Sequence, residues 1–163
     1  MKITFDQDDL GQSYQKHHDA LIVSLCVGNC LTKWILVDGG LSASVIFLDT
    51  IRTMGIDESE IVRQSITLVG FNGEPTNTIR EIILPVYARG INRQTKFNVV
   101  DCPSAYNAIL GRPWIHDMKA IPSTFHQVVK FPSEFTAIKR DQKVTRKCYS
   151  MTFKPKTRTL LQL

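Results

Sequence analysis

Short strand-like runs separated by glycine-containing turns limit the fold of this chain more than any other feature of its sequence. The first two runs cover residues 21–27 and 30–37 and are mostly aliphatic. Gly28-Asn29 between them is a two-residue turn of the kind that joins antiparallel strands. The sequence therefore predicts a β-hairpin that leads directly into the segment 38–40, which reads Asp-Gly-Gly.

Two further hairpins are predicted downstream. One contains the turn 70–74, whose Asn-Gly pair is the strongest short hairpin signal, and the other contains the turn 89–92. Strands this short, with a turn about every ten residues, predict an all-β, barrel-like domain. The strands of these two hairpins are expected at residues 65–69, 79–86, 84–87 and 96–101.

Two short helices are expected among the strands. The apolar residues of 48–54 recur at helical spacing, and Gly55 can end that helix because glycine readily adopts the left-handed conformation common at helix ends. Gly111 precedes the second helix, in which Pro113 suits the first turn.

The length of 163 residues, 43% of them hydrophobic, suits one globular domain. The net charge of +5 is concentrated in residues 139–163, which hold eight basic residues against Asp141 alone and so carry +7, leaving −2 for the rest. We interpret this segment as a solvated linker, and weak, nonspecific contact of its basic residues with nucleic acid is the alternative. An RNA-binding function is disfavoured because no aromatic residues alternate with basic ones over the core.

The chain has no run of about 18 apolar residues and no apolar stretch near its start. We therefore expect a cytoplasmic protein that makes no membrane contact, and reduced cysteines. Cys26 and Cys30 have a loosely zinc-like spacing, but neither a second cysteine pair nor a spaced histidine pair completes four ligands, so no metal is expected.

Three segments occur in an informative order: the apolar strand and Asp-Gly-Gly at 35–40, the hairpin at 68–74, and the segment 99–114. Together they resemble the retropepsin-like aspartic proteases, most closely those of plant gypsy-type retrotransposons. The resemblance covers roughly residues 20–135. The segment 99–114 is its most specific part, since ordinary core packing would explain Ile109 and Leu110 but not the whole string.

The resemblance implies a closed β-barrel with one or two short helices, half of an active site that only a homodimer completes, and no cofactor. It assigns the catalytic carboxylate to Asp38 and a polypeptide as substrate. The implied catalytic loop contains Gly39, Gly40 and Ser42; the flap that covers substrate contains Gly70, Phe71, Asn72 and Gly73; and the residues that thread beside the loop are Ile109, Leu110, Gly111 and Arg112.

The chain contains one Asp-x-Gly element of this type, because Asp49-Thr50 is followed by Ile51 and Asp101 by Cys102. The second carboxylate must then come from an identical subunit across a two-fold axis. Two carboxylates about 3 Å apart cannot both ionise cheaply, so they share one proton. One can then deprotonate a water that attacks the scissile carbonyl while the other donates a proton.

The sequence departs from the family pattern in three respects. Gly39 replaces a Thr or Ser whose hydroxyl braces the two loops across the dimer axis, and Leu41 replaces a smaller residue and supplies no donor to the carboxylate. Arg112 often pairs with an acidic residue after the loop, but Ser42 and Ser44 occupy those positions here. The sequence therefore identifies no acidic residue that pairs with Arg112.

The resemblance divides the chain into an N-terminal extension (1–19), a retropepsin-like domain (20–135) and a basic connector (136–163). It implies an endopeptidase that processes a retrotransposon polyprotein in the cytoplasm or within virus-like particles. Retention of Asp38 favours this function. Gly39 and Leu41 favour the alternative, a catalytically inactive module for dimerisation or binding.

Overall fold

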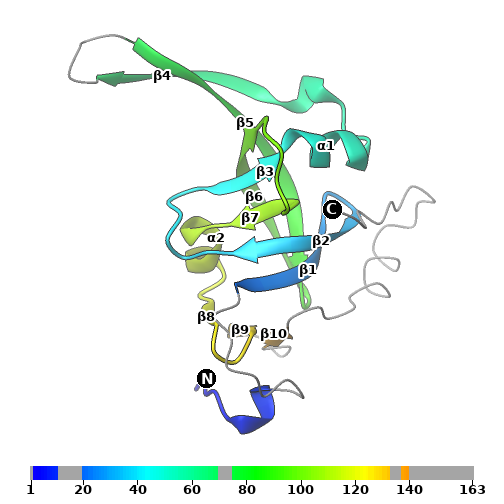
Figure 1. The fold of residues 1–163 in the computed structure, drawn as a ribbon, viewed down its shortest axis with the longest axis vertical. Helices are drawn as coiled ribbons and strands as arrows, with labels where there is room; N and C mark the ends of the chain where they lie inside the picture. Colours follow the sequence, from blue (N-terminus) through cyan, green and yellow to red (C-terminus); the bar gives the residue numbers. More distant parts are fainter. Residues whose placement is uncertain (1, 11–19, 70–74, 133–136, 140–163) are drawn as a thin grey trace.

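The computed structural model describes residues 2–10, 20–69, 75–132 and 137–139, with side chains omitted for 65–69 and 75–78. Its main body is a closed six-stranded barrel, because β1 pairs with both β2 and β5 (Figure 1). The barrel confirms the predicted all-β class. Its strands follow the order β1 (Leu21–Val27), β2 (Cys30–Val37), β7 (Ala108–Leu110), β3 (Ser44–Phe47), β6 (Ile91–Val100) and β5 (Pro75–Ala88), and β4 (Val62–Val69) pairs with β5 outside the ring.

The predicted hairpins are confirmed in the part of the chain that the structure describes. Gly28 (φ 55°) and Asn29 (φ 65°) both lie in the left-handed region, as a two-residue turn between twisted strands requires. The second and third hairpins share one strand, β5, which is longer than the runs predicted for it. The predicted turn 70–74 lies outside the described residues.

Both predicted helices are present. Helix α1 (Leu48–Met54) ends at Gly55, whose φ of 74° is the left-handed conformation expected there. Helix α2 (Arg112–Asp117) has Pro113 in its first turn, where a missing N–H costs no helical hydrogen bond. Two short 3-10 helices, η1 (Gln7–Leu10) and η2 (Glu58–Glu60), were not predicted.

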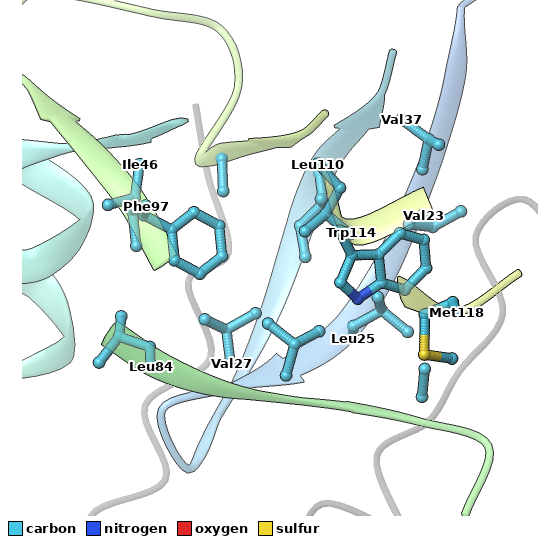
Figure 2. Close-up of a cluster of buried hydrophobic side chains, with 14 of the residues drawn as sticks. Val23, Leu25, Val27, Val37, Ile46, Leu84, Phe97, Leu110, Trp114 and Met118 are labelled. Atoms are coloured by element: carbon cyan, nitrogen blue, oxygen red, sulfur yellow. The ribbon is translucent and has the colours of Figure 1, made fainter. Parts of the chain in front are cut away.

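The barrel interior is filled by aliphatic and aromatic side chains from every strand of the ring. Trp114 of α2 closes one end of this core next to Leu25 and Met118, and Phe97 lies beside Ile46 farther along (Figure 2). Trp114 is 2% exposed and Phe97 is fully buried. Helix α2 is therefore part of the core, which fixes the position of the segment that precedes it.

A second, three-stranded sheet follows α2. It consists of β8 (Ile121–Ser123), β9 (Val128–Lys130) and β10 (Ala137–Lys139), with β9 in the middle. Ile138 of β10 is fully buried in the main core. Residues 137–139 of the expected connector 136–163 are thus paired in a sheet, and residues 136 and 140–163 lie outside the described part.

The N-terminal segment lies against this small sheet (Figure 1). The Lys130 ammonium donates to the Thr4 carbonyl at 2.6 Å and to Asp9 Oδ2 at 2.7 Å. It also lies 5.1 Å from the centre of the Phe5 ring. One lysine of β9 therefore holds residues at both ends of this short segment.

Cys26 is disulfide-bonded, so the expectation of reduced cysteines is wrong for this residue. Its side chain points away from the barrel core and forms a small cluster with Leu31 and Tyr87. Within the described residues, no helix has the length and apolar character that a membrane crossing requires.

Candidate active site

Asp38 leaves the barrel at the end of β2. Ile35 and Val37 of this strand are buried in the core, and Val37 pairs with Leu110 in the parallel ladder between β2 and β7. The Asp38 N–H extends that ladder by donating to the Leu110 carbonyl at 3.0 Å. Backbone pairing with β7 therefore fixes where the aspartate emerges from the sheet.

The half-buried Asp38 carboxylate is held by its own loop. Oδ1 accepts the Gly40 N–H at 2.8 Å, and the Asp38 carbonyl accepts the Leu41 N–H at 3.3 Å. A Cβ added to Gly40 would lie 3.1 Å from Asp38 Oδ1, which is tight. Glycine at this position thus leaves room for the carboxylate to approach the backbone donor.

The β7–α2 junction packs tightly against the same loop. Gly111 leaves no room for a side chain, because an added Cβ would lie 2.5 Å from the Ala43 carbonyl oxygen. The Arg112 N–H donates to the Leu41 carbonyl at 2.9 Å, and the Gly111 N–H donates to Ser44 Oγ at 3.1 Å. The segment Ile109-Leu110-Gly111 therefore runs beside the Asp38 loop and supports it.

Asn107 is a second support, and sequence reasoning did not single it out. Its N–H donates to the Trp34 carbonyl at 2.9 Å and its side-chain amide donates to the Lys33 carbonyl at 2.7 Å. The Asn107 carbonyl accepts the Thr50 hydroxyl at 2.8 Å. Asn107 is 5% exposed, so these are protected bonds that connect β2, α1 and the start of β7.

The bonds from Asn107 stabilise a β-bulge in β2. One residue of β1 faces both Lys33 and Trp34 there, and Trp34 has a φ of 57°, which is unusual for an aromatic residue. An extra residue shifts the alternation of side chains along the strand. The bulge therefore helps to decide on which side of the barrel Asp38 emerges.

No protein-family model and no curated protein matches this sequence. Among solved structures, the retroviral protease-like domain of Ddi1 from Leishmania major aligns with 77% of this chain and 96% of its own, with a TM-score of 0.52 and 18% identity. The chain has a retropepsin-like fold. A retropepsin-like aspartic protease from Rickettsia conorii matches with a TM-score of 0.46, 22% identity and coverage of 63% and 75% of the two chains. EIAV protease complexed with the inhibitor HBY-793 matches with a TM-score of 0.45 and 18% identity, over 68% of this chain and 99% of its own.

Gly39 and Leu41 are the two residues of the Asp38 loop that replace the residues expected there. The φ of Gly39 is not in the left-handed region, and a Cβ added there would meet only Ile115 Cδ1, at 3.8 Å. The loop thus accepts glycine without requiring it. Leu41 is half-buried, and its backbone N–H and carbonyl both form the hydrogen bonds described above.

The other predicted loop residues differ in their surroundings. Ser42 is exposed, whereas Ser44 is buried and accepts a backbone N–H. The Arg112 side chain is exposed and forms no ion pair with the residues that the structure describes, so only its backbone supports the loop.

The hairpin interpreted as the flap is formed by β4 and β5, which extend beyond the barrel (Figure 1). The four residues assigned to its tip, Gly70, Phe71, Asn72 and Gly73, lie outside the described residues. Their role in covering substrate stays a prediction. In the described part of the chain, no group of three His, Cys, Asp or Glu residues could hold a metal ion.

Proposed function

We propose that this chain is an aspartic endopeptidase that works as a homodimer. One observation carries the proposal: an apolar strand of a retropepsin-like barrel delivers Asp38 into a loop where its carboxylate accepts a backbone N–H from Gly40. Support of that loop by the segment 109–112 adds to it. The arrangement positions one carboxylate and leaves its second oxygen available for chemistry.

The proposed reaction needs two copies of Asp38, one from each subunit. A shared proton lets one carboxylate take a proton from water while the other donates one to the substrate carbonyl. The attacked carbonyl becomes a tetrahedral intermediate, and the leaving amine then receives a proton. Gly39 lacks the hydroxyl that would brace the two loops. We therefore expect a weaker dimer than a Thr or Ser at this position would give.

The substrate that we propose is a polyprotein of a gypsy-type retrotransposon, processed in the cytoplasm or within virus-like particles. Support comes from the specific sequence of the segment 99–114 and from the way its last residues pack on the Asp38 loop. Apolar residues around the cleavage site are expected for this substrate class.

A second candidate is an inactive module that keeps the fold for dimerisation or binding. The specific observation in its favour is Gly39, because that position offers no hydroxyl to the partner loop and has room for one. This candidate predicts a folded protein, with dimers or bound partners, and no cleavage.

The experiment that decides between them is an Asp38→Asn substitution measured in a pepstatin-sensitive cleavage assay. The amide keeps the shape of the side chain but cannot share a proton, so we expect a loss of about 10²–10⁴-fold in rate with an unchanged melting temperature. Asp101→Asn, an exposed aspartate outside the loop, serves as the control and should retain activity. Normal cleavage by Asp38→Asn would show that the catalytic assignment is wrong, and an inactive wild type would favour the binding module.

A further inference from the structure

Two arginines face each other on the stem of the β4–β5 hairpin. Arg63 of β4 and Arg80 of β5 are direct partners in the antiparallel register. Directly opposed residues have Cβ atoms about 4.5–5.5 Å apart and point to the same face of the sheet. Arg63 is exposed and Arg80 is half-buried, so neither side chain is enclosed in the barrel core.

The alternation of side chains along β5 shows which face carries the pair. Arg80 has the same parity as Ile82, Leu84 and Val86, and these three side chains are buried in the barrel core. The arginines therefore extend the barrel-facing side of β5 past the rim of the barrel. Figure 1 shows the hairpin extending to the same side of the view as the loop between β2 and β3, which carries Asp38.

Neither arginine has a partner in the part of the chain that the structure describes. The ion pairs there use other cations, and neither Arg63 nor Arg80 donates a side-chain hydrogen bond to a described residue. The neighbouring Glu81 points to the opposite face and lies 3.9 Å from Lys96. Like charges directly opposite each other destabilise a sheet. An anion between the two guanidinium groups would remove that repulsion.

We propose that Arg63 and Arg80 form a subsite for an acidic side chain of the peptide substrate. The proposal rests on the proposed peptide-cleaving function and names a feature of its substrates: a Glu or Asp outside the apolar residues at the cleavage site. A guanidinium donates two parallel N–H bonds to a carboxylate, which gives geometric selectivity as well as attraction. Two opposed guanidinium groups can hold one carboxylate from both sides.

A peptide fits this position better than a nucleic acid does. The pair consists of two cations that continue the barrel-facing side of the hairpin, whereas phosphate backbones are recognised by extended basic surfaces. An extended peptide places alternate side chains on one side, so a single acidic residue at the right distance from the cleavage site would reach the pair.

Binding is measured in the Asp38→Asn background so that no peptide is cut. Labelled peptides with an apolar centre carry either Glu or Gln at one flanking position at a time, and fluorescence polarisation gives their affinities. At one or more positions, we expect the Glu peptide to bind about three- to tenfold more tightly than its Gln counterpart. Arg63→Gln and Arg80→Gln should each bring this ratio toward one.

The matched control is Arg93→Gln, which removes an exposed arginine from β6 near the β5–β6 turn and should leave the ratio unchanged. The double variant Arg63→Glu/Arg80→Glu should reverse the preference so that a Lys peptide binds more tightly than a Glu peptide. A purely structural role of the arginines would not produce this reversal.

Three results would overturn the proposal: no position with a Glu preference, a preference that survives both arginine variants, or an equal loss in Arg93→Gln. A fourth result would assign the pair to nucleic acid. In that case the arginine variants would bind a single-stranded oligonucleotide more weakly, and the protein with both arginines intact would show no Glu preference. If the chain with Asp38 intact cuts no peptide but the Glu preference is present, the protease proposal fails and the acidic subsite stands.

Discussion

The Asp38 loop and the N-terminal segment 2–10 are attached to the barrel in different ways. Backbone groups hold the loop: Asp38, Leu41 and Arg112 all contribute main-chain hydrogen bonds, and Gly111 packs against its backbone. Side chains hold the N-terminal segment: Lys130 contacts a carbonyl, a carboxylate and a ring, and the His126 ring lies 5.3 Å from that of Phe5.

The difference predicts different sensitivities. The hydrogen bonds that join the loop to residues 110–112 are between main-chain groups and carry no titratable group. The attachment of the loop to the barrel should therefore respond to changes in shape and space but little to pH. The contacts of Lys130 include an ion pair whose side chains are 14% and 11% exposed, so the N-terminal segment should respond to charge and pH. The following predictions test this comparison, from the largest expected effect to the smallest.

Gly111→Ala should destabilise the protein most. The added Cβ would lie 2.5 Å from the carbonyl oxygen of Ala43, and a clash between a Cβ and a backbone atom cannot be relieved by rotating a side chain. We expect a loss of about 3 kcal/mol in the free energy of unfolding, measured by urea denaturation. Gly39→Ala is the control, because its Cβ would make only an ordinary contact at 3.8 Å and should change stability little. Equal effects of the two variants would show that the loop is not closely packed.

Gly39→Thr should tighten the proposed dimer. The backbone at Gly39 is not left-handed and has room for a side chain, so threonine can place a hydroxyl next to the partner loop. Two symmetric hydrogen bonds of about 0.5–1.5 kcal/mol each would lower the dimer dissociation constant by roughly fivefold to more than a hundredfold. Sedimentation over a dilution series measures it, with Gly39→Ala as the variant that lacks the hydroxyl. A weaker threonine dimer would contradict the assignment of this loop.

Asp9→Asn should have the smallest effect and the clearest pH dependence. Burial by itself raises the pKa of Asp9, but hydrogen bonds from Lys130 and the Asp6 backbone, with the nearby positive charges, hold it below the ordinary value of 3.8. A lowered pKa means that the ionised carboxylate stabilises the folded state above pH 3.8, and that this contribution disappears as the pH falls through the folded-state pKa.

We therefore expect Asp9→Asn to cost about 1 kcal/mol near neutral pH and to match the wild type at the acidic end of a melting series. Asp8→Asn, an exposed neighbour in the same 3-10 helix, is the control and should show neither effect. A pH-independent difference between Asp9→Asn and the wild type would show that the ion pair with Lys130 is not what holds the segment.

The parts of this protein that depend on local chemistry could be predicted from the amino-acid sequence. Gly28-Asn29 and Gly55 occupy left-handed positions that few other residues adopt, so the first hairpin and the end of α1 could be predicted from neighbours in the chain. The position of Asp38 directly after a strand could be predicted for the same reason. Its catalytic assignment depended on the resemblance of three ordered segments, because Asp-Gly-Gly alone also suits an ordinary turn.

Which distant residues support and surround that site depends on how the strands are arranged in space. Asn107 reaches Thr50 and Lys33 across 57 and 74 positions of sequence, and Ser44 reaches Gly111 across 67. The register of the β4–β5 hairpin, which shifts between Ser65 and Leu68, brought Arg63 opposite Arg80, and the predicted turn alone does not specify that shift. Such contacts depend on how the whole barrel closes, because backbone polar groups that are buried far from their neighbours in sequence must find partners wherever the fold places them.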